Sequence, residues 1–232
     1  MKDIYFVIRS RNEEDWIGYC IQSIIDTFGP GQNIVVVDND SEDDSLKRVQ
    51  MFVKERNKNN IKICNIKKNE YTPGKSINTG ISKLKEFKNF NPNNSIVAII
   101  SAHCQIKKID KQRLFNHFKK EKNCFGVVGN QIPVYLGKKV RRQYVWKNFL
   151  HKEVQKNTAE TEGVHKYFFH NAFSFIDYAI WLDHQFDENW TSKEDRYWAE
   201  NLVDKNKNFY FDPEIQCIHH WTKNGATWRG YG

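Results

Sequence analysis

The chain has little glycine or proline and no long hydrophobic run. Its 232 residues include 12 glycines and 5 prolines, too few for a collagen-like or proline-rich protein. The most apolar stretch, residues 95–102, is far shorter than the ~20 residues that a membrane-spanning helix needs. The amino-terminal segment carries charges on both sides of a short apolar run and lacks the apolar length of a secretory signal peptide. We therefore expect a globular protein without a membrane span.

The cysteines form no recognisable pattern. They number 5, are widely spaced and include no C-x-x-C pair. This spacing indicates neither a zinc ribbon nor a disulfide framework. We therefore expect reduced thiols and a cytoplasmic location, and we keep the inner face of the membrane as an alternative location.

Aromatic residues and positive charge are abundant. Aromatics make up 14% of the chain and hydrophobic residues 39%, which excludes a disordered protein. With 36 basic and 28 acidic residues, the formal net charge is +8. Such a charge suits nucleic acid, an anionic membrane surface or phosphate-bearing substrates, but it also suits an ordinary solvated surface. Because no nucleic-acid-binding motif is present, we expect no nucleic-acid partner.

Short apolar runs alternate with helical patterns through the first part of the chain. This alternation is typical of an α/β fold with a mostly parallel central sheet and helices on both faces. No linker or internal repeat divides the chain. Strands are expected at residues 4–8, 34–37, 61–66, 95–102 and 125–128 and near Phe209 and Ile215, and helices at residues 16–28, 46–53, 77–87 and 114–118 and from about Ser192.

Polar residues follow three of the predicted strands. Arg9 and Asn12 follow the first, Asp38 ends the second, and Ser101 and His103 lie at the end of the fourth. Ligands of open parallel sheets bind outside the carboxyl ends of the strands. The chain has neither G-x-G-x-x-G nor G-x-x-x-x-G-K-[ST], so a nicotinamide fingerprint and a P-loop are both unsupported. A bound nucleotide would therefore be held by side chains at the strand ends.

A series of segments follows in the order typical of one enzyme family. They are FVIRSRNEEDWI, VVVDNDSEDDS, YTPGKSINTGI, IISAHCQI, VVGNQIP, HNAFSFIDYAIW, FDENWTSKEDRYW and IQCIHHW. Together they resemble an inverting glycosyltransferase of family 2 with the GT-A (nucleotide-diphospho-sugar transferase) fold, and especially the rhamnosyltransferase-like branch. The resemblance implies one domain over residues 1–232, with a nucleotide-sugar-binding half at 1–130 and an acceptor and catalytic half at 131–232.

The resemblance also implies a reaction. A sugar would pass, with inversion, from a UDP- or dTDP-type nucleotide sugar to a hydroxyl of a glycan or lipid-linked saccharide in surface polysaccharide synthesis. Two rival hypotheses stay open. One is a nucleotide-sugar-binding module without turnover, and the other is a peripheral membrane-binding protein that uses the basic segment 138–147.

Several residues correspond to the family's donor contacts. Asp38 would accept a hydrogen bond from the imide N–H of the base, although a turn or helix cap would also explain this aspartate. Lys75 and Asn78 would line the nucleotide, although a solvated lysine at a helix start is equally consistent with the pattern. The other donor-side residues that the resemblance implies are Arg9, Asn12, Ser101 and Asn171.

Histidines stand where the family has metal-binding groups. Ser101 and His103 occupy the places of the family's Asp-x-Asp, and a related pattern, Asp-Ser-His-Cys, uses its histidine as a manganese ligand. The resemblance therefore implies a divalent cation, Mn²⁺ or Mg²⁺, on His103, although this imidazole could instead bind phosphate. His219 or His220 would be a second ligand. Neighbouring strand residues point to opposite faces, so at most one of them faces the site, and we favour His219.

The pair Glu194 and Asp195 resembles the family's catalytic carboxylates. Asp195 would be the general base that removes the acceptor's proton. Carboxylates are also favoured in the first turn of a helix that Ser192 would cap, where the helix dipole keeps them ionised. On the acceptor side, Trp198 would wall the site or pack in the core, and Asp187 would fix the loop before the base.

Overall fold

The computed structural model describes residues 2–55, 60–140, 152–161, 168–225 and 228. Its strands are β1 (Asp3–Ser10), β2 (Asn33–Asp38), β3 (Asn60–Asn65), β4 (Ser95–Ser101), β5 (Cys104–Lys108), β6 (Cys124–Tyr135), β7 (Lys138–Lys139), β8 (Gln155–Asn157), β9 (Phe173–Asp177) and β10 (Asn208–His220). Its helices are α1 (Ile17–Phe28), α2 (Ser45–Glu55), α3 (Pro73–Lys83), α4 (Lys111–Lys120), α6 (Tyr178–Asp183) and α7 (Glu194–Asp204).

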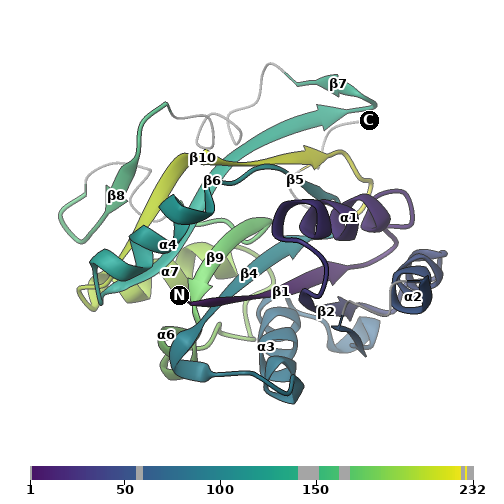
Figure 1. The fold of residues 1–232 in the computed structure, drawn as a ribbon, viewed down its shortest axis with the longest axis horizontal. Coiled ribbons are helices and arrows are strands. Elements are labelled where there is room, and N and C mark those ends of the chain that lie inside the picture. Colours follow the sequence, from purple (N-terminus) through teal and green to yellow (C-terminus); the bar gives the residue numbers. More distant parts are fainter. Residues whose placement is uncertain (1, 56–59, 141–151, 162–167, 226–227, 229–232) are drawn as a thin grey trace.

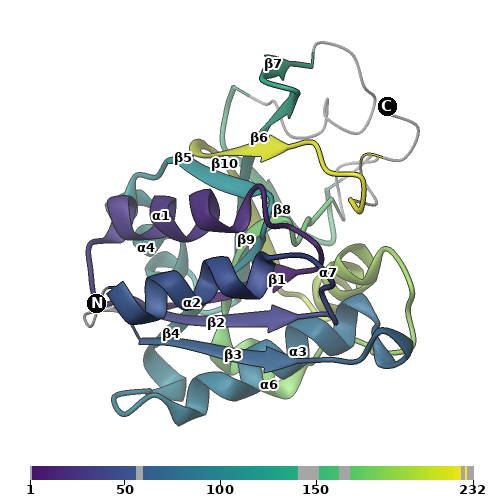
Figure 2. The ribbon, with the colours of Figure 1, turned by 90° about the vertical axis from the view of Figure 1, so that its right-hand side faces the viewer.

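All described strands belong to one sheet, with the order β3-β2-β1-β4-β9-β6-β10-β5 and with β7 and β8 attached to β6 and β10. Strands β3, β2, β1 and β4 run parallel, and β10 runs parallel to β6. Strand β9 lies antiparallel between β4 and β6, and β5 is an antiparallel edge strand. The arrowheads of β2 and β3 point to the same side in Figure 2. The predicted α/β class with a mostly parallel sheet is confirmed.

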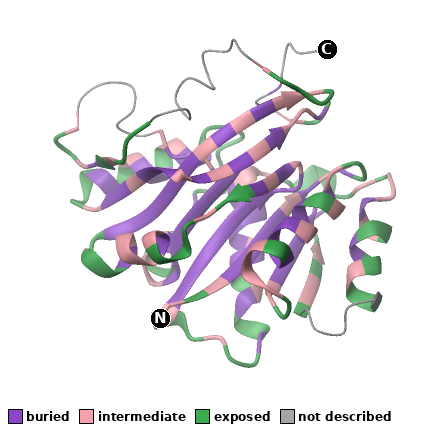
Figure 3. Cartoon of the chain, turned by 45° about the horizontal axis from the view of Figure 1, so that its top comes forward, coloured by how far each residue is buried: buried purple, intermediate pink, exposed green. Residues whose placement is uncertain are grey.

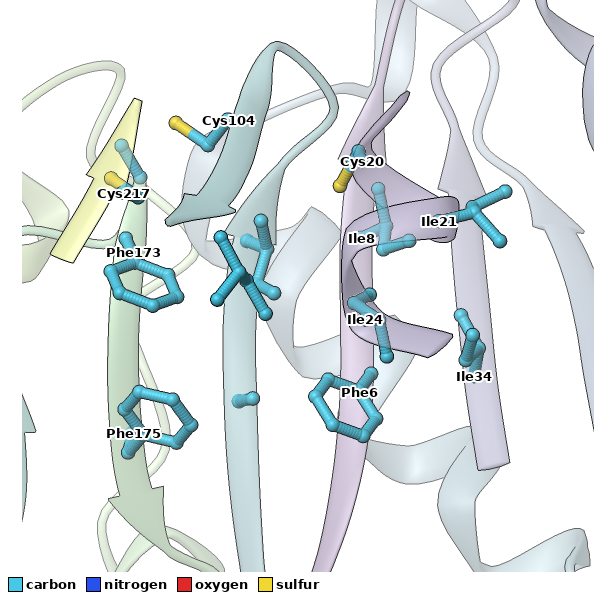
Figure 4. Close-up of a cluster of buried hydrophobic side chains, with 14 of the residues drawn as sticks. Phe6, Ile8, Cys20, Ile21, Ile24, Ile34, Cys104, Phe173, Phe175 and Cys217 are labelled. Carbon is cyan, nitrogen blue, oxygen red and sulfur yellow. The ribbon is translucent and has the colours of Figure 1, made fainter. Parts of the chain in front are cut away.

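The sheet separates two hydrophobic layers. Phe6 and Ile8 of β1 face α1, where Ile21 and Ile24 contact them (Figure 4). Tyr5 and Val7 of the same strand point the other way and pack with residues of α3, α6 and α7. Because both faces are covered, the central strands are almost wholly buried, as Figure 3 shows, and they carry continuous apolar runs.

Some elements differ from the predicted ones. The strands expected near Phe209 and Ile215 are one long strand, β10, which bulges between Asp212 and Gln216. Pro213 lies in this bulge, where a residue without an N–H is tolerated. Elements β5, β9 and α6 were not predicted, because runs this short show too little periodicity. Figure 1 shows β9 lying between β4 and β6 at the centre of the sheet.

Other expectations concern the chain as a whole. The boundary expected at residue 130 falls within β6, and strands from both sides of it share the sheet. All the cysteines are free thiols. No helix among the described residues is long and apolar enough to cross a membrane. Most of the basic segment 138–147 lies outside the described residues, except that Lys138–Lys139 forms β7.

Gly80 of α3 and Gly18 of α1 should tolerate alanine differently. A Cβ on Gly80 would lie 2.4 Å from Val7 Cγ1 and 2.7 Å from Val37 Cγ2, whereas one on Gly18 would meet only Phe52 at 3.8 Å. We expect Gly80→Ala to lower the free energy of unfolding by ~1–3 kcal/mol through overpacking. Gly18→Ala should be neutral or stabilising, since alanine favours helix. Urea denaturation measures both; equal stability of the two variants would contradict this packing.

Candidate active site

Two imidazoles face each other at the carboxyl ends of the strands. His103 follows β4 and His219 lies near the end of β10, with their Nε2 atoms 3.0 Å apart. His220 points away: its ring stacks on Trp16 at 4.2 Å and its Nε2 lies 3.3 Å from Gln105 Oε1. Side chains alternate along β10, so His219, the residue that we favour, is the one that faces His103. The prediction of His220 as a metal ligand is wrong, because its ring is packed elsewhere.

Hydrogen bonds fix the protonation of both rings. His103 Nδ1 lies 2.8 Å from Glu13 Oε1, and His219 Nδ1 lies 2.8 Å from Gln131 Oε1. Both oxygens accept, so each Nδ1 carries a hydrogen and Nε2 is the ring atom left to face the other histidine. Burial, with the neighbouring histidines, lowers the pKa of His219 well below its ordinary value and keeps it neutral. Two lone pairs at 3.0 Å repel unless a proton or a metal ion lies between them.

The donor set fits a divalent cation. Nitrogen ligands lie about 2.1 Å from a first-row metal such as zinc, so adjacent ligands of one ion lie about 3 Å apart. Each Nδ1–H donates to an oxygen, the arrangement that orients metal-ligating histidines. Among the described residues, Cys104 also places its sulfur in a group with His103 and His219 within 4.8 Å. Burial raises the pKa of the Cys104 thiol well above its usual range, which opposes the thiolate form that a metal ligand needs.

The two carboxylates at the start of α7 are buried, and Glu194 lies near the ring of His170. Asp195 Oδ2 accepts from the Asn171 backbone N–H at 3.1 Å, and Arg9 Nη1 lies 3.4 Å from Glu194 Oε1. Burial, together with the charge of Asp195, raises the pKa of Glu194 to about 6. Burial also raises the pKa of Asp195, although it accepts two backbone N–H groups. The helix start favours the ionised form of Asp195, whereas desolvation acts in the opposite direction and raises its pKa. Lys193, with a φ of 60°, precedes the helix in place of the expected cap Ser192.

Hydrogen bonds join the loop after β1 to the loop after β2. Both Asp38 carboxylate oxygens accept from Ser41, Oδ2 from its N–H at 3.0 Å and Oδ1 from its hydroxyl at 2.6 Å. Asn12 Oδ1 accepts from the Glu42 N–H at 2.8 Å. The turn considered for Asp38 is therefore present. Ser101 is buried and pairs in register with Arg9, so it lies at the same sheet edge.

Lys75 and Asn78 of α3, expected to line the nucleotide, have contacts within the protein. Lys75 forms an exposed ion pair with Glu70 at 3.2 Å. The Asn78 amide is fully used: it donates to Phe186 O and Glu188 Oε1 and accepts from Trp181 Nε1 and the Phe186 N–H. The prediction of Asn78 as a donor contact is wrong, because this side chain anchors the 184–188 loop.

The expected acceptor residues also have other contacts. Trp198 is buried, stacks on Phe186 at 4.5 Å and donates through Nε1 to His184 O at 2.6 Å. It packs in the core, which is the second of the two roles expected for it. Asp187 is exposed, and its Oδ1 accepts from the Asn189 N–H at 2.8 Å. The backbone of Asp187 packs against Gly74, where a Cβ would lie 2.4 Å from Asp187 O.

Buried polar atoms without a hydrogen-bond partner gather at this edge of the sheet. An unpaired buried polar group costs ~1–3 kcal/mol, so such a cluster indicates where a ligand, an ion or water supplies the partner. Among the described residues they include Arg9 Nε, Ser10 Oγ, Glu13 Oε2, Asn39 Oδ1 and Asn171 Nδ2.

Four residues of this region were not identified from the sequence. Glu13, Asn39, Gln131 and His170 contact or neighbour the predicted residues. Burial lowers the pKa of His170 to about 3, so this ring is neutral. Gln131 and His170 lie far from His103 and His219 in the chain, and no spacing pattern links them.

Comparison with solved structures shows the same fold in several glycosyltransferases. TarS residues 1–349 from S. aureus, in complex with UDP-GlcNAc, superposes with a TM-score of 0.72 at 18% identity over 100% of this chain and 62% of that one. GalNAc-T7 with UDP, GalNAc and Mn²⁺ gives 0.69 at 13% identity over 97% of this chain and 45% of that one. The mannosyltransferase PcManGT from Pyrobaculum calidifontis, with GDP-Man and Mn²⁺, gives 0.65 at 17% identity over 98% and 60%.

These proteins are longer than this chain, which spans less than two thirds of each. No curated protein matches the sequence. The family model "Glycosyl transferase family 2" matches residues 5–180, which is most of the chain and includes the ends of β1, β2 and β4. The fold is the GT-A fold, and the chain belongs to glycosyltransferase family 2.

Proposed function

We propose that the chain transfers a sugar, with inversion, from a UDP- or dTDP-type nucleotide sugar to a hydroxyl of a glycan or lipid-linked saccharide in surface polysaccharide synthesis. The observation that carries this proposal is the meeting of two groups at one sheet edge: the facing imidazoles His103 and His219, and the buried carboxylates Glu194 and Asp195. The carboxylates suit the acceptor's proton, and the imidazoles suit a cation at the leaving diphosphate.

His103 and His219 would hold the divalent cation, Mn²⁺ or Mg²⁺. Such an ion, when bound, neutralises charge on a departing diphosphate. Glu13 and Gln131 accept from the two Nδ1–H groups and so turn both Nε2 atoms toward the same place. Because the protein offers few ligands, diphosphate oxygens would complete the coordination. Structural neighbours that contain Mn²⁺ support this part of the proposal.

Asp195 would act as the general base. Its carboxylate is held by the N–H groups of Asn171 and Arg196, at 3.1 and 2.9 Å. Burial weakens the solvation of the anion and raises its pKa, which makes it a stronger base near neutral pH. Arg9 bridges Glu194 and Asn171 O, so it holds the pair beside β9.

The nucleotide would bind across the ends of β1 and β2. Each Asp38 oxygen holds one Ser41 donor and retains a further lone pair for an imide N–H. We retain Arg9, Asn12, Lys75, Ser101 and Asn171 as donor-side residues. The resemblance of the Ser101–His103 region to the rhamnosyltransferase-like branch is the basis for favouring a deoxyhexose.

The test of donor class is a thermal-shift panel. UDP-, dTDP- and GDP-sugars are added with and without Mn²⁺, because a ligand that binds only the folded state raises its melting temperature. We expect the largest shift for a UDP- or dTDP-sugar with Mn²⁺. The absence of any shift with every nucleotide sugar would contradict the proposal. Flotation with lipid vesicles tests the alternative of a peripheral membrane-binding protein.

Transfer should lose activity in mild acid. The raised pKa values of Glu194 and Asp195 belong to one coupled pair, which takes up a proton as the pH falls through about 6. Protonation removes the base, so kcat/KM should be constant above this region and fall about tenfold per pH unit below it. Glu194→Gln removes the neighbouring charge and should move the acidic limb to lower pH. A flat profile between pH 5 and 8 would rule out this pair as the base.

A further inference from the structure

Behind the facing imidazoles lies a series of hydrogen bonds whose direction can be assigned. It runs from the Ala172 backbone through His170 and Gln131 to His219. Gln131 and His219 are fully buried, so solvent does not compete for these groups. The atoms of a glutamine amide and the tautomer of a histidine are normally inferred from their partners. Here a backbone N–H, which can only donate, sets both.

The direction follows step by step. The Ala172 N–H donates to His170 Nδ1 at 3.1 Å, so this nitrogen is an acceptor. The Gln131 group 3.2 Å from the same nitrogen must then be the amide NH₂. The carbonyl end of Gln131 therefore faces His219 Nδ1, 2.8 Å away, and that nitrogen must carry a hydrogen. His219 is left with its lone pair on Nε2, directed at His103.

We infer that Gln131, oriented by His170, is a positioning residue that holds His219 in the tautomer with a lone pair on Nε2. The assignment of the tautomer does not depend on the proposed function. The purpose of the tautomer does, because the Nε2 lone pair is what a cation in the site would bind. A flipped Gln131 would set its carbonyl oxygen against the His170 Nδ1 lone pair and its NH₂ against His219 Nδ1. That arrangement would force the hydrogen onto His219 Nε2, where it blocks coordination.

Three variants separate this role from simple packing. Gln131→Met keeps the length of the side chain and removes both hydrogen bonds. Gln131→Glu keeps an oxygen that accepts from His219 Nδ1. Gln105→Met is the matched control, because Gln105 makes the corresponding contact to His220, whose ring stacks on Trp16.

The first measurement is long-range ¹H–¹⁵N NMR on the metal-free full chain, which reports which ring nitrogen carries the hydrogen. We expect Nδ1–H for His219 in the wild type, in Gln131→Glu and in Gln105→Met, and loss of this single tautomer in Gln131→Met. A wild-type His219 protonated on Nε2 alone would overturn the inference. If Gln131→Met does not fold, the wild-type tautomer and its retention in Gln131→Glu still decide it.

The second measurement is Mn²⁺ affinity with UDP present, followed by electron paramagnetic resonance of the free ion. Loss of a partner that orients a metal-ligating histidine costs about 10- to 100-fold in affinity. We expect this loss in Gln131→Met, recovery in Gln131→Glu and no change in Gln105→Met. Wild-type affinity in Gln131→Met would overturn the inference. Nδ1–H on His219 in a wild-type protein that binds no Mn²⁺ would support the tautomer assignment and reject the proposed metal site instead.

Discussion

Asp195→Asn is expected to slow sugar transfer about 100- to 10,000-fold while nucleotide affinity stays within a few fold of the wild type. The carboxylate would act on the acceptor hydroxyl, and the asparagine amide cannot take up its proton. Asparagine has the same shape as this carboxylate but can accept from only one of the Asn171 and Arg196 N–H groups, so the measurement of nucleotide affinity is needed to exclude a structural effect. Steady-state kinetics measures the rate, and calorimetric titration of UDP measures binding.

The matched control is Glu200→Gln, a carboxylate further along the same helix, which should leave the rate unchanged. Near-normal turnover by Asp195→Asn would reject this residue as the base. A loss of nucleotide affinity as large as the loss of rate would instead assign it a structural role.

His219→Ala is expected to weaken Mn²⁺ binding about 100-fold or more, because one of two protein ligands is lost. Activity should fall with it and should be recovered only in part by excess Mn²⁺. His220→Ala is a matched control from the next position on β10, since its ring stacks on Trp16 instead of facing His103. It should retain the wild-type response to Mn²⁺.

Activity is then measured against Mn²⁺ concentration after exhaustive chelation. Full activity of the wild type in chelator would reject metal dependence. An equal loss of Mn²⁺-dependent activity in His219→Ala and His220→Ala would show that this activity does not depend on the position of His219 opposite His103.

Much of the fold could be predicted, because its central strands are buried on both faces and carry continuous apolar runs. Strands β1, β2 and β4 and helix α1 lie where the patterns indicate, whereas α3 begins and ends four residues before the expected range 77–87. Strand β9 was missed although it lies at the centre of the sheet, since FSFID is short and passes directly into α6. The bulge of β10 was read as a break, because Pro213 interrupts the apolar pattern.

The orientation of a site residue was predictable where it lies on a strand, because side chains alternate between the two faces. Alternation along β10 was sufficient to favour His219 over His220. The role of a side chain was not predictable where the same residue type can either bind a ligand or pack and hydrogen-bond within the protein. Asn78 lies in a segment that resembles the family's and Trp198 lies one turn after Glu194 and Asp195, yet contacts with the 184–188 loop occupy both side chains. Gln131 enters the site only because β6 lies beside β10, a pairing that no local pattern shows.

The most direct test of the central claim is calorimetric titration of UDP into metal-stripped protein with and without Mn²⁺. The account predicts weak binding of UDP alone and much tighter binding with Mn²⁺, because the His103–His219 pair and the diphosphate would share the ion. The enhancement should disappear in His219→Ala and persist in His220→Ala. Tight binding of UDP that is unaffected by Mn²⁺ or chelator would contradict the account.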